Sequence, residues 1–165
     1  MTEEGFNDAL CALADIGREA EKLGIALKEI RATPQSLDGA MGWLTVQGLA
    51  SAIEKIYGGC ERAMAILAKS VDGQAIEAGE GWHRALILRM ASPFGTSRPA
   101  VLSAETVAEL DKLRSFRHRE RNTYGSELRG ARVLEIAADA VFVPLVMASD
   151  IKRLAVYLEE KKPTS

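Results

Sequence analysis

The sequence predicts an all-α protein, an up-and-down bundle of about five helices that forms a single domain over residues 1–165. Apolar residues recur at alternating steps of three and four over two long segments, which is the spacing of one face of a helix. No segment shows the sustained alternation of apolar and polar residues that a strand would give. With 47% hydrophobic and 27% charged residues, the chain has the composition of one globular domain.

Two long helices carry most of the apolar pattern. Their stripes run from Phe6 to Ile30 and from Val46 to Leu67. Thr33-Pro34 should end the first helix, because the residue before a proline is pushed out of the helical conformation. Asp72-Gly73 should end the second. Gly58-Gly59 lies inside the second helix and is a candidate kink.

Three shorter helices should follow. Ser103 is the expected N-cap of the middle one, with Glu105 in its first turn, where a carboxylate suits the helix dipole. Pro144 is a candidate kink in the last one. The segment 92–102 contains two prolines and a glycine and should be a loop. The three helices are expected to cover Glu80 to Met90, Ser103 toward Tyr124-Gly125, and Ala131 to Leu158.

Bulk properties exclude several classes of protein. The formal net charge of -2 gives no support to nucleic-acid binding by overall charge, so such a site would have to be local. Cys11 and Cys60 fall on apolar helical positions and are expected to be buried, reduced thiols. The sequence shows no signal peptide and no membrane span, so we expect a soluble cytoplasmic protein. Two histidines without metal-ligand spacing, and no glycine-rich phosphate loop, suggest neither a metal nor another cofactor.

The fourth helix carries the most informative pattern. Its inward face begins as core, with Val107, Leu110 and Leu113. Arginine is seldom buried without a partner. Either acids such as Glu120 neutralise the arginines on this face, or the arginines line a cleft or subunit interface that accepts an anion. At helical spacing the face continues through Arg114, Arg117, Arg121 and Tyr124.

The stretch 114–132 is locally basic, with six arginines opposed only by Glu120 and Glu127. A guanidinium can bind phosphate through two parallel hydrogen bonds and stays charged at any working pH. A solvated helix laced with ion pairs explains the same charges equally well. If the stretch binds nucleic acid, the candidate RNA-binding residues are Arg114, Arg119 and Arg121.

A motif in this helix resembles that of the HepT-like ribonucleases of the HEPN superfamily, in which an Arg is followed by four residues, a His, any residue and a Tyr. Here Arg117 is followed by the polar His118, then by Asn122 and Tyr124 at the family spacing. Gly81-Trp82-His83 and Arg98-Pro99 also resemble the family. The resemblance extends from about residue 80 to residue 160.

The resemblance implies a helical bundle that acts as the toxin of a toxin–antitoxin pair and cleaves RNA without a metal ion. Arg117 would bind the phosphate, and Tyr124 would complete the motif. The partners implied are RNA, a second copy of the chain with the two motif helices facing across one cleft, and a nucleotidyltransferase antitoxin. In some members the antitoxin adenylylates the motif tyrosine, which is Tyr124 here.

The departure from the family falls on its catalytic histidine, which is Asn122 here. An asparagine amide cannot accept a proton near neutral pH, and loss of a general base costs ~10²–10⁴ in rate. The chain is therefore a weakened nuclease, a pseudoenzyme or an inactivated toxin. His118, one turn before Asn122, is an alternative base, although local hydrogen bonding is the favoured role for it. His83 is expected to be structural or peripheral.

A second function from another class stays open. A non-catalytic HEPN protein could bind a nucleotidyltransferase or RNA as a scaffold, and Asn122 is the residue that favours this alternative.

Overall fold

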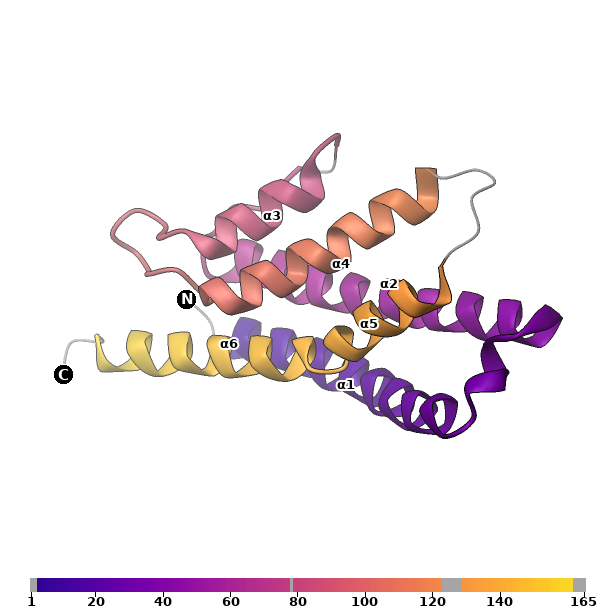
Figure 1. Cartoon of the computed structure of the whole chain (residues 1–165). Coiled ribbons are helices and arrows are strands. Elements are labelled where there is room, and N and C mark those ends of the chain that lie inside the picture. The colour runs from indigo at the N-terminus through magenta and orange to yellow at the C-terminus, as the bar shows by residue number, and fades with distance from the viewer. Residues whose placement is uncertain (1–2, 78, 123–128, 162–165) are drawn as a thin grey trace.

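The computed structural model describes residues 3–77, 79–122 and 129–161, with the backbone alone at residues 3, 34 and 120–122. This part of the chain contains no strand, only an isolated bridge between Phe94 and Arg98. The predicted all-α bundle is confirmed (Figure 1). Its elements are α1 (Glu3–Ala32), the short 3₁₀ helix η1 (Pro34–Leu37), α2 (Gly39–Ser70), α3 (Trp82–Ala91), α4 (Ala104–Asn122), α5 (Gly130–Ala140) and α6 (Val143–Glu160).

The long helices α1 and α2 pack against each other as a hairpin and form the base of the bundle (Figure 1). Their apolar stripes are buried as expected, and Ile53 and Ile56 of α2 are completely inaccessible. η1 and Gly39, which has a φ of 62°, turn the chain between them. α5 packs mainly on α2, α6 packs on α1, and α3 and α4 cover the remaining face of α2.

α2 is one helix through both residues of the Gly58-Gly59 pair, and Gly59 is the one that serves helix packing. A Cβ atom added to Gly59 would lie 2.8 Å from the Cβ of Ile16 in α1, which is too close for two carbon atoms. A Cβ atom added to Gly58 would meet nothing within 4 Å. Gly59 therefore lets α1 and α2 approach closely, and the candidate kink is a contact between two helices.

The last predicted helix is two helices, α5 and α6, separated at Val141 and Phe142. Pro144 lies in the first turn of α6, where backbone N–H groups have no acceptor within the helix, so the missing N–H of proline costs no hydrogen bond. Pro144 therefore begins a helix here, whereas the sequence suggested a kink inside one.

The two cysteines differ in burial. Cys60 is completely buried, as expected, whereas Cys11 is exposed, so the prediction for Cys11 was wrong. Ala9 and Leu13 occupy the buried face of α1, and Cys11 lies midway between them in sequence. Since positions two residues apart on a helix point in different directions, Cys11 falls outside the stripe.

Arg98 holds the loop between α3 and α4 and is itself only 3% exposed. Its Nε donates to one carboxylate oxygen of Asp72 at 2.6 Å, and its Nη2 donates to the other at 2.8 Å. Its Nη1 donates to the backbone carbonyls of Ser92 and Pro99. The loop is thereby tied to the end of α2, which fixes where α4 begins.

The start of α4 is capped as expected and is also anchored to α6. The Ser103 hydroxyl accepts a hydrogen bond from the Thr106 N–H at 3.2 Å, as an N-cap does. One carboxylate oxygen of the buried Asp150 in α6 accepts the Ser103 N–H at 2.8 Å and the Thr106 hydroxyl at 2.6 Å. The first turn of α4 is therefore joined to the C-terminal helix.

No helix in the described ranges combines the length and the apolar character needed to cross a lipid bilayer.

The paired glycines of α2 give a stability test with a built-in control. Gly58→Ala should raise the free energy of unfolding by about 0.5–1 kcal/mol, because alanine favours a helix over glycine. Gly59→Ala should lower it by about 1–3 kcal/mol, because the added methyl group must displace Ile16. Urea unfolding followed by circular dichroism measures both changes. Equal shifts for the two variants would show that the close approach of α1 and α2 is not required.

Candidate active site

The inward face of α4 ends in an ion pair. Leu110 and Leu113 are completely buried on this face, and Val107 is partly buried. Arg117 comes next at helical spacing, with 22% of its side chain exposed. Its Nη1 donates to Oε2 of Glu61 in α2 at 2.8 Å. Among the described side chains, the acid that pairs with this arginine comes from another helix. The side chain of Glu120, which the sequence suggested, lies outside the described residues.

Glu61 is the centre of the candidate site. Its side chain is 6% exposed, and it lies on α2 beside the buried residues Cys60 and Met64. Its Oε2 accepts from Arg117, and its Oε1 forms a hydrogen bond with Nδ1 of His83 in α3. A buried carboxylate without such partners would cost several kcal/mol. One side chain of α2 thus requires both α3 and α4 at this point.

Tyr57 lies beside the same carboxylate. Tyr57 lies one turn before Glu61 and is completely buried. Burial raises the pKa of the Tyr57 phenol well above its ordinary value, and the charge of Glu61 raises it further, so the hydroxyl stays protonated. The Tyr57 ring centroid is 5.8 Å from the guanidinium carbon of Arg117 and 6.4 Å from the His83 ring centroid. These contacts place an arginine and a histidine around one tyrosine.

His83 is held on more than one side and is still accessible. The Trp82 ring meets it edge-on, with centroids 5.0 Å apart, and the Trp82 indole N–H donates to the carbonyl of Ile76 at 3.2 Å. Its side chain is nevertheless 42% exposed. The imidazole thus reaches both the buried carboxylate and the solvent, and the expectation that His83 is structural or peripheral stays a prediction.

The other predicted site residues lie around this cluster or outside the described residues. Arg114 is half-buried and pairs with Asp111 at 2.8 Å, and its charge acts on Tyr57. His118 and Arg119 are exposed, and Arg119 Nε donates to the carbonyl of Ser115. The side chains of Arg121 and Asn122 and the whole of Tyr124 lie outside the described residues. Of the predicted motif residues, the structure brings Arg117 to the cluster.

Sequence reasoning missed two residues of this cluster, Tyr57 and Glu61, and it named His83 only as structural or peripheral. One local signal was present: Tyr57 and Glu61 are four residues apart, and they flank apolar residues of the stripe, so they share one edge of a buried helix face. A glutamate at the edge of a buried stripe needs a partner from elsewhere in the chain. The spacing within α2 gives no information on which residue supplies it.

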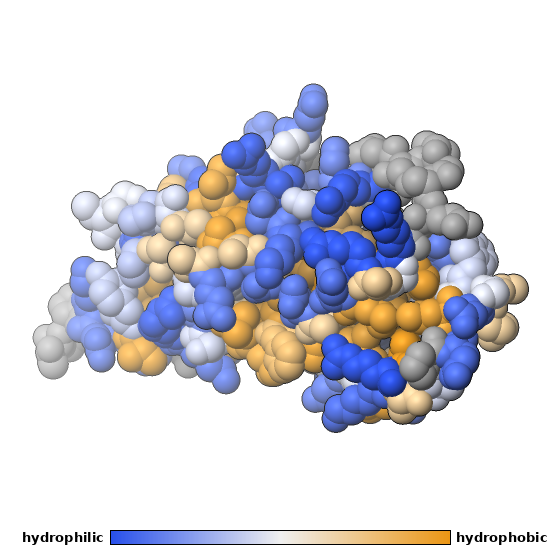
Figure 2. Space-filling view, in the orientation of Figure 1, coloured by the Kyte–Doolittle hydropathy of each residue, from blue (hydrophilic) through white to orange (hydrophobic). Residues whose placement is uncertain are grey.

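The surface over α4 is hydrophilic, as Figure 2 shows, although the protein as a whole is slightly acidic. Its side chains include Asp111, Lys112, Arg114 and Arg119. Arg114 pairs with Asp111 and Lys112 pairs with Glu109, so the described part of α4 carries acids and bases side by side. Among the described residues, no group of three or more His, Cys, Asp or Glu side chains could hold a metal ion.

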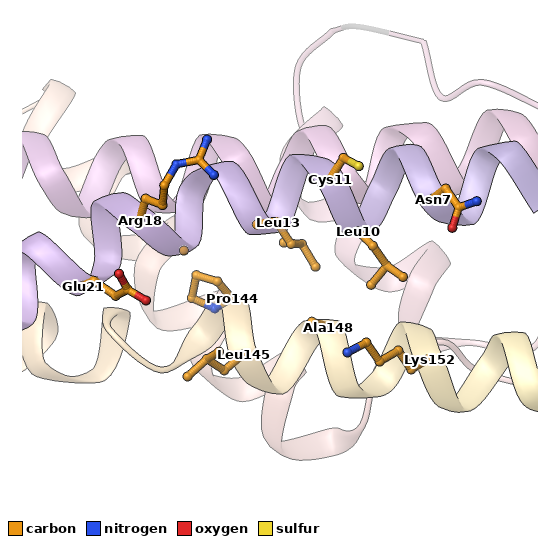
Figure 3. A pocket seen from close by; sticks show the side chains of 12 residues that line it. Asn7, Leu10, Cys11, Leu13, Arg18, Glu21, Pro144, Leu145, Ala148 and Lys152 are labelled. Atoms are coloured by element: carbon orange, nitrogen blue, oxygen red, sulfur yellow. The ribbon is translucent and has the colours of Figure 1, made fainter.

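A concave surface of about 620 Å³ lies between α1 and α6, away from this cluster (Figure 3). Leu10 and Leu13 of α1 and Pro144 and Leu145 of α6 line it. Cys11 also lines this groove, which explains its exposure. The groove is mainly apolar and does not contain the carboxylate, imidazole and guanidinium that come together at Glu61, so we place the candidate active site at Glu61.

Comparison with known proteins identifies a family. A family model described as HepT-like protein matches residues 48–158. The matched stretch contains Tyr57, Glu61, His83 and Arg117, together with all of α3, α4 and α5. No curated protein and no solved structure matches the chain.

The two thiols should differ in reactivity. Burial, and then the neighbouring charge of Glu61, raises the pKa of Cys60 to about 12. Its thiolate is therefore scarce at pH 8, whereas Cys11 is exposed. A thiol-specific disulfide reagent should modify one thiol in the native protein at pH 8 and two in urea. Cys11→Ser should remove the native reaction. Rapid labelling of native Cys60 would contradict the tight packing around Glu61.

Proposed function

Because this chain belongs to the HepT-like family, we propose that it is a HEPN-type endoribonuclease that acts as the toxin of a toxin–antitoxin pair. Arg117 binds the phosphate at which RNA is cut. The observation that carries this proposal is the position of Arg117, which stands in the family motif and is held by the buried Glu61 at 2.8 Å. An arginine fixed in this way can present its charge in one orientation.

Arg117 keeps donors for a ligand. A guanidinium has five N–H donors, and in the described part of the chain one of them is used, toward Glu61. The remaining donors form a planar fork that matches two phosphate oxygens. Since Glu61 balances the charge of Arg117, attraction for a polyanion must come from further arginines. Arg114, Arg119 and Arg121 on the same helix are proposed to supply it.

The proposed reaction is transesterification without a metal ion. The RNA 2′-oxygen attacks the adjacent phosphorus, the bond to the 5′-oxygen breaks, and a 2′,3′-cyclic phosphate remains on one product. Arg117 stabilises the negative charge that develops on the phosphate oxygens. Asn122 stands where the family has its base, and its amide can donate a hydrogen bond to RNA but cannot take the 2′-hydroxyl proton.

Three partners belong to the proposal. RNA is the substrate. A second copy of the chain joins the first so that two Arg117 side chains face one cleft. Sedimentation at micromolar concentration should give a dimer, and a monomer there would refute this pairing. The third partner is a nucleotidyltransferase antitoxin whose target is Tyr124, where AMP would add bulk and negative charge. Mass spectrometry after co-expression would refute this target if AMP maps only to Tyr57 or Tyr157.

The alternative function is a non-catalytic scaffold that binds a nucleotidyltransferase or RNA. The residue that favours it is Asn122, because a chain that has lost the family base can keep its binding surfaces.

The first functional test compares RNA cleavage by the parent chain, Arg117→Ala and Arg18→Ala. Arg117→Ala should lower the cleavage rate by ~10²-fold or more, because it removes the group that meets the transition-state charge. Arg18 also lies in an ion pair, but on α1, where it contacts Asp15, so Arg18→Ala should leave cleavage unchanged. Gel analysis of a labelled RNA measures all three rates.

Loss of the Glu61 partner could also weaken the fold, so thermal unfolding of Arg117→Ala must be measured alongside. Arg117→Lys provides a second check, since it keeps one charge but not the planar fork, and it should restore only part of the rate. Equal cleavage by the parent and a folded Arg117→Ala variant would overturn the proposed role of Arg117. A parent chain that binds RNA without cutting it would favour the scaffold.

The second functional test restores the family motif. If no other residue already acts as the base, Asn122→His should raise cleavage by ~10²-fold or more, because histidine titrates near neutral pH and can act as a general base. No gain in a parent chain that already cuts RNA would point to a base elsewhere in the protein. The gain should vanish in Arg117→Ala, since the base then has no bound phosphate beside it. Expression of Asn122→His should also become toxic to cells. An inert Asn122→His variant that is folded would contradict the nuclease proposal.

A further inference from the structure

We propose that His83, oriented by Glu61, is the general base of this protein and takes the role that Asn122 cannot fill. This inference rests on the proposed nuclease function. It names a catalytic residue on α3, outside the motif of α4. His83 forms a hydrogen bond with Glu61, its imidazole is accessible, and it shares the Glu61 carboxylate with Arg117.

The Glu61 carboxylate sets which imidazole nitrogen carries a proton. A carboxylate only accepts hydrogen bonds, so Nδ1 of His83 must be the donor in the bond to Oε1. In the neutral imidazole the other nitrogen, Nε2, then has a free lone pair. Among the described residues, no hydrogen-bond partner is seen for Nε2. The imidazole is therefore fixed in the tautomer that a general base needs.

Accessibility separates His83 from a purely structural histidine. Its side chain is 42% exposed, while the carboxylate behind it is 6% exposed. The Trp82 and Tyr57 rings restrict the rotation of the imidazole on the protein side. A buried acid that orients an exposed imidazole is the arrangement that makes histidine an effective base.

Arg117 lies close to His83. His83 and Arg117 occupy the two oxygens of one carboxylate, so they are neighbours although they are 34 residues apart in sequence (117 − 83). A phosphate bound to the free donors of Arg117 would lie beside the imidazole. The 2′-hydroxyl of the same nucleotide unit is adjacent to that phosphate, within the range at which a base can take its proton.

The sequence limits the competing groups. The chain contains two histidines, His83 and His118. The titratable and charged groups that face the imidazole are Glu61 and Tyr57 of α2 and Arg117 of α4, with Arg114 beyond Tyr57. Tyr57 stays protonated in the neutral range and arginine stays charged, so neither can serve as the base. His118 is the histidine against which the inference must be tested.

The proposed step balances as follows. Nε2 of His83 takes the proton of the RNA 2′-hydroxyl, and the 2′-oxygen forms a bond to phosphorus. The bond between phosphorus and the 5′-oxygen breaks, and that oxygen takes a proton from water. The imidazolium then returns its proton to the solvent. The products are a 2′,3′-cyclic phosphate and a 5′-hydroxyl, with no net gain or loss of protons.

The experiment measures single-turnover cleavage of a labelled RNA against pH by the full-length parent, His83→Gln and His118→Gln. RNA affinity is measured separately with an oligonucleotide that carries a 2′-deoxy group at the cut site. The parent rate should fall at low pH as the base becomes protonated. His83→Gln should cut RNA ~10²-fold or more slowly than the parent, and its rate should no longer fall at low pH. Its affinity for the 2′-deoxy oligonucleotide should be retained.

Chemical rescue distinguishes a base from a structural contact. His83→Ala leaves a space beside Glu61 that free imidazole can enter, so added imidazole should raise its cleavage rate in proportion to concentration. Arg117→Ala is the matched control in the same cluster. Imidazole should not rescue this variant, because it has lost the group that binds the phosphate and still has its base. Glu61→Gln should lower the rate, since the imidazole loses its orienting carboxylate and Arg117 loses its charged partner.

Loss of the low-pH fall in His83→Gln, together with rescue of His83→Ala, supports the inference. It is overturned if His118→Gln removes that fall while His83→Gln keeps it, or if imidazole does not rescue His83→Ala. A parent chain that cuts no RNA also overturns it. In that case Asn122→His tests the proposed function separately. Cleavage by this variant would support the nuclease function without His83 as its base, whereas a variant that cuts no RNA would overturn both the nuclease function and the inference about His83.

Discussion

The buried carboxylate of Glu61 is the constraint on which the upper half of the bundle depends. It places one negative charge at the edge of the apolar face of α2, and that charge is tolerable because α3 supplies His83 and α4 supplies Arg117. Both helices must therefore be present, in register, at the same point of α2. Apolar packing alone would allow small shifts of α3 and α4. Two hydrogen bonds to one carboxylate restrict their positions more tightly, because hydrogen bonds need a defined distance and angle. A polar contact, and not only apolar packing, thus sets the geometry of the candidate site.

The opposite end of α4 is fixed by different means. Arg98 ties the preceding loop to Asp72, and Asp150 accepts hydrogen bonds from the first turn of α4. A helix held at its start and near its middle presents the following residues in a defined direction. This matters for a protein of net charge -2, because an anion must be attracted by local charges and not by the whole molecule. The fold provides a firm support for a short basic segment.

The sequence predicted the parts of the structure that depend on local periodicity. The two long helices, the loop 92–102 and the Ser103 cap follow from residues close together in the chain, and all three are present. The break between α5 and α6 was missed because Pro144 is compatible both with a kink and with a first turn. The exposure of Cys11 was missed because it lies next to a stripe. The family motif gave Arg117, but its partner Glu61 lies 56 residues earlier, and no local pattern joins two positions so far apart.

The link between Asp150 and the start of α4 has a consequence for the order in which the protein matures. A ribosome builds a chain from its N-terminus, so residues 103–122 are synthesised before α6. Until Asp150 has been added, the Ser103 N–H and the Thr106 hydroxyl lack the acceptor that they have in the finished molecule. The basic helix can form earlier, but its first turn is secured only after Asp150 has been added. A nascent chain that stops before α6 therefore carries the arginines of α4 without the full framework that orients them.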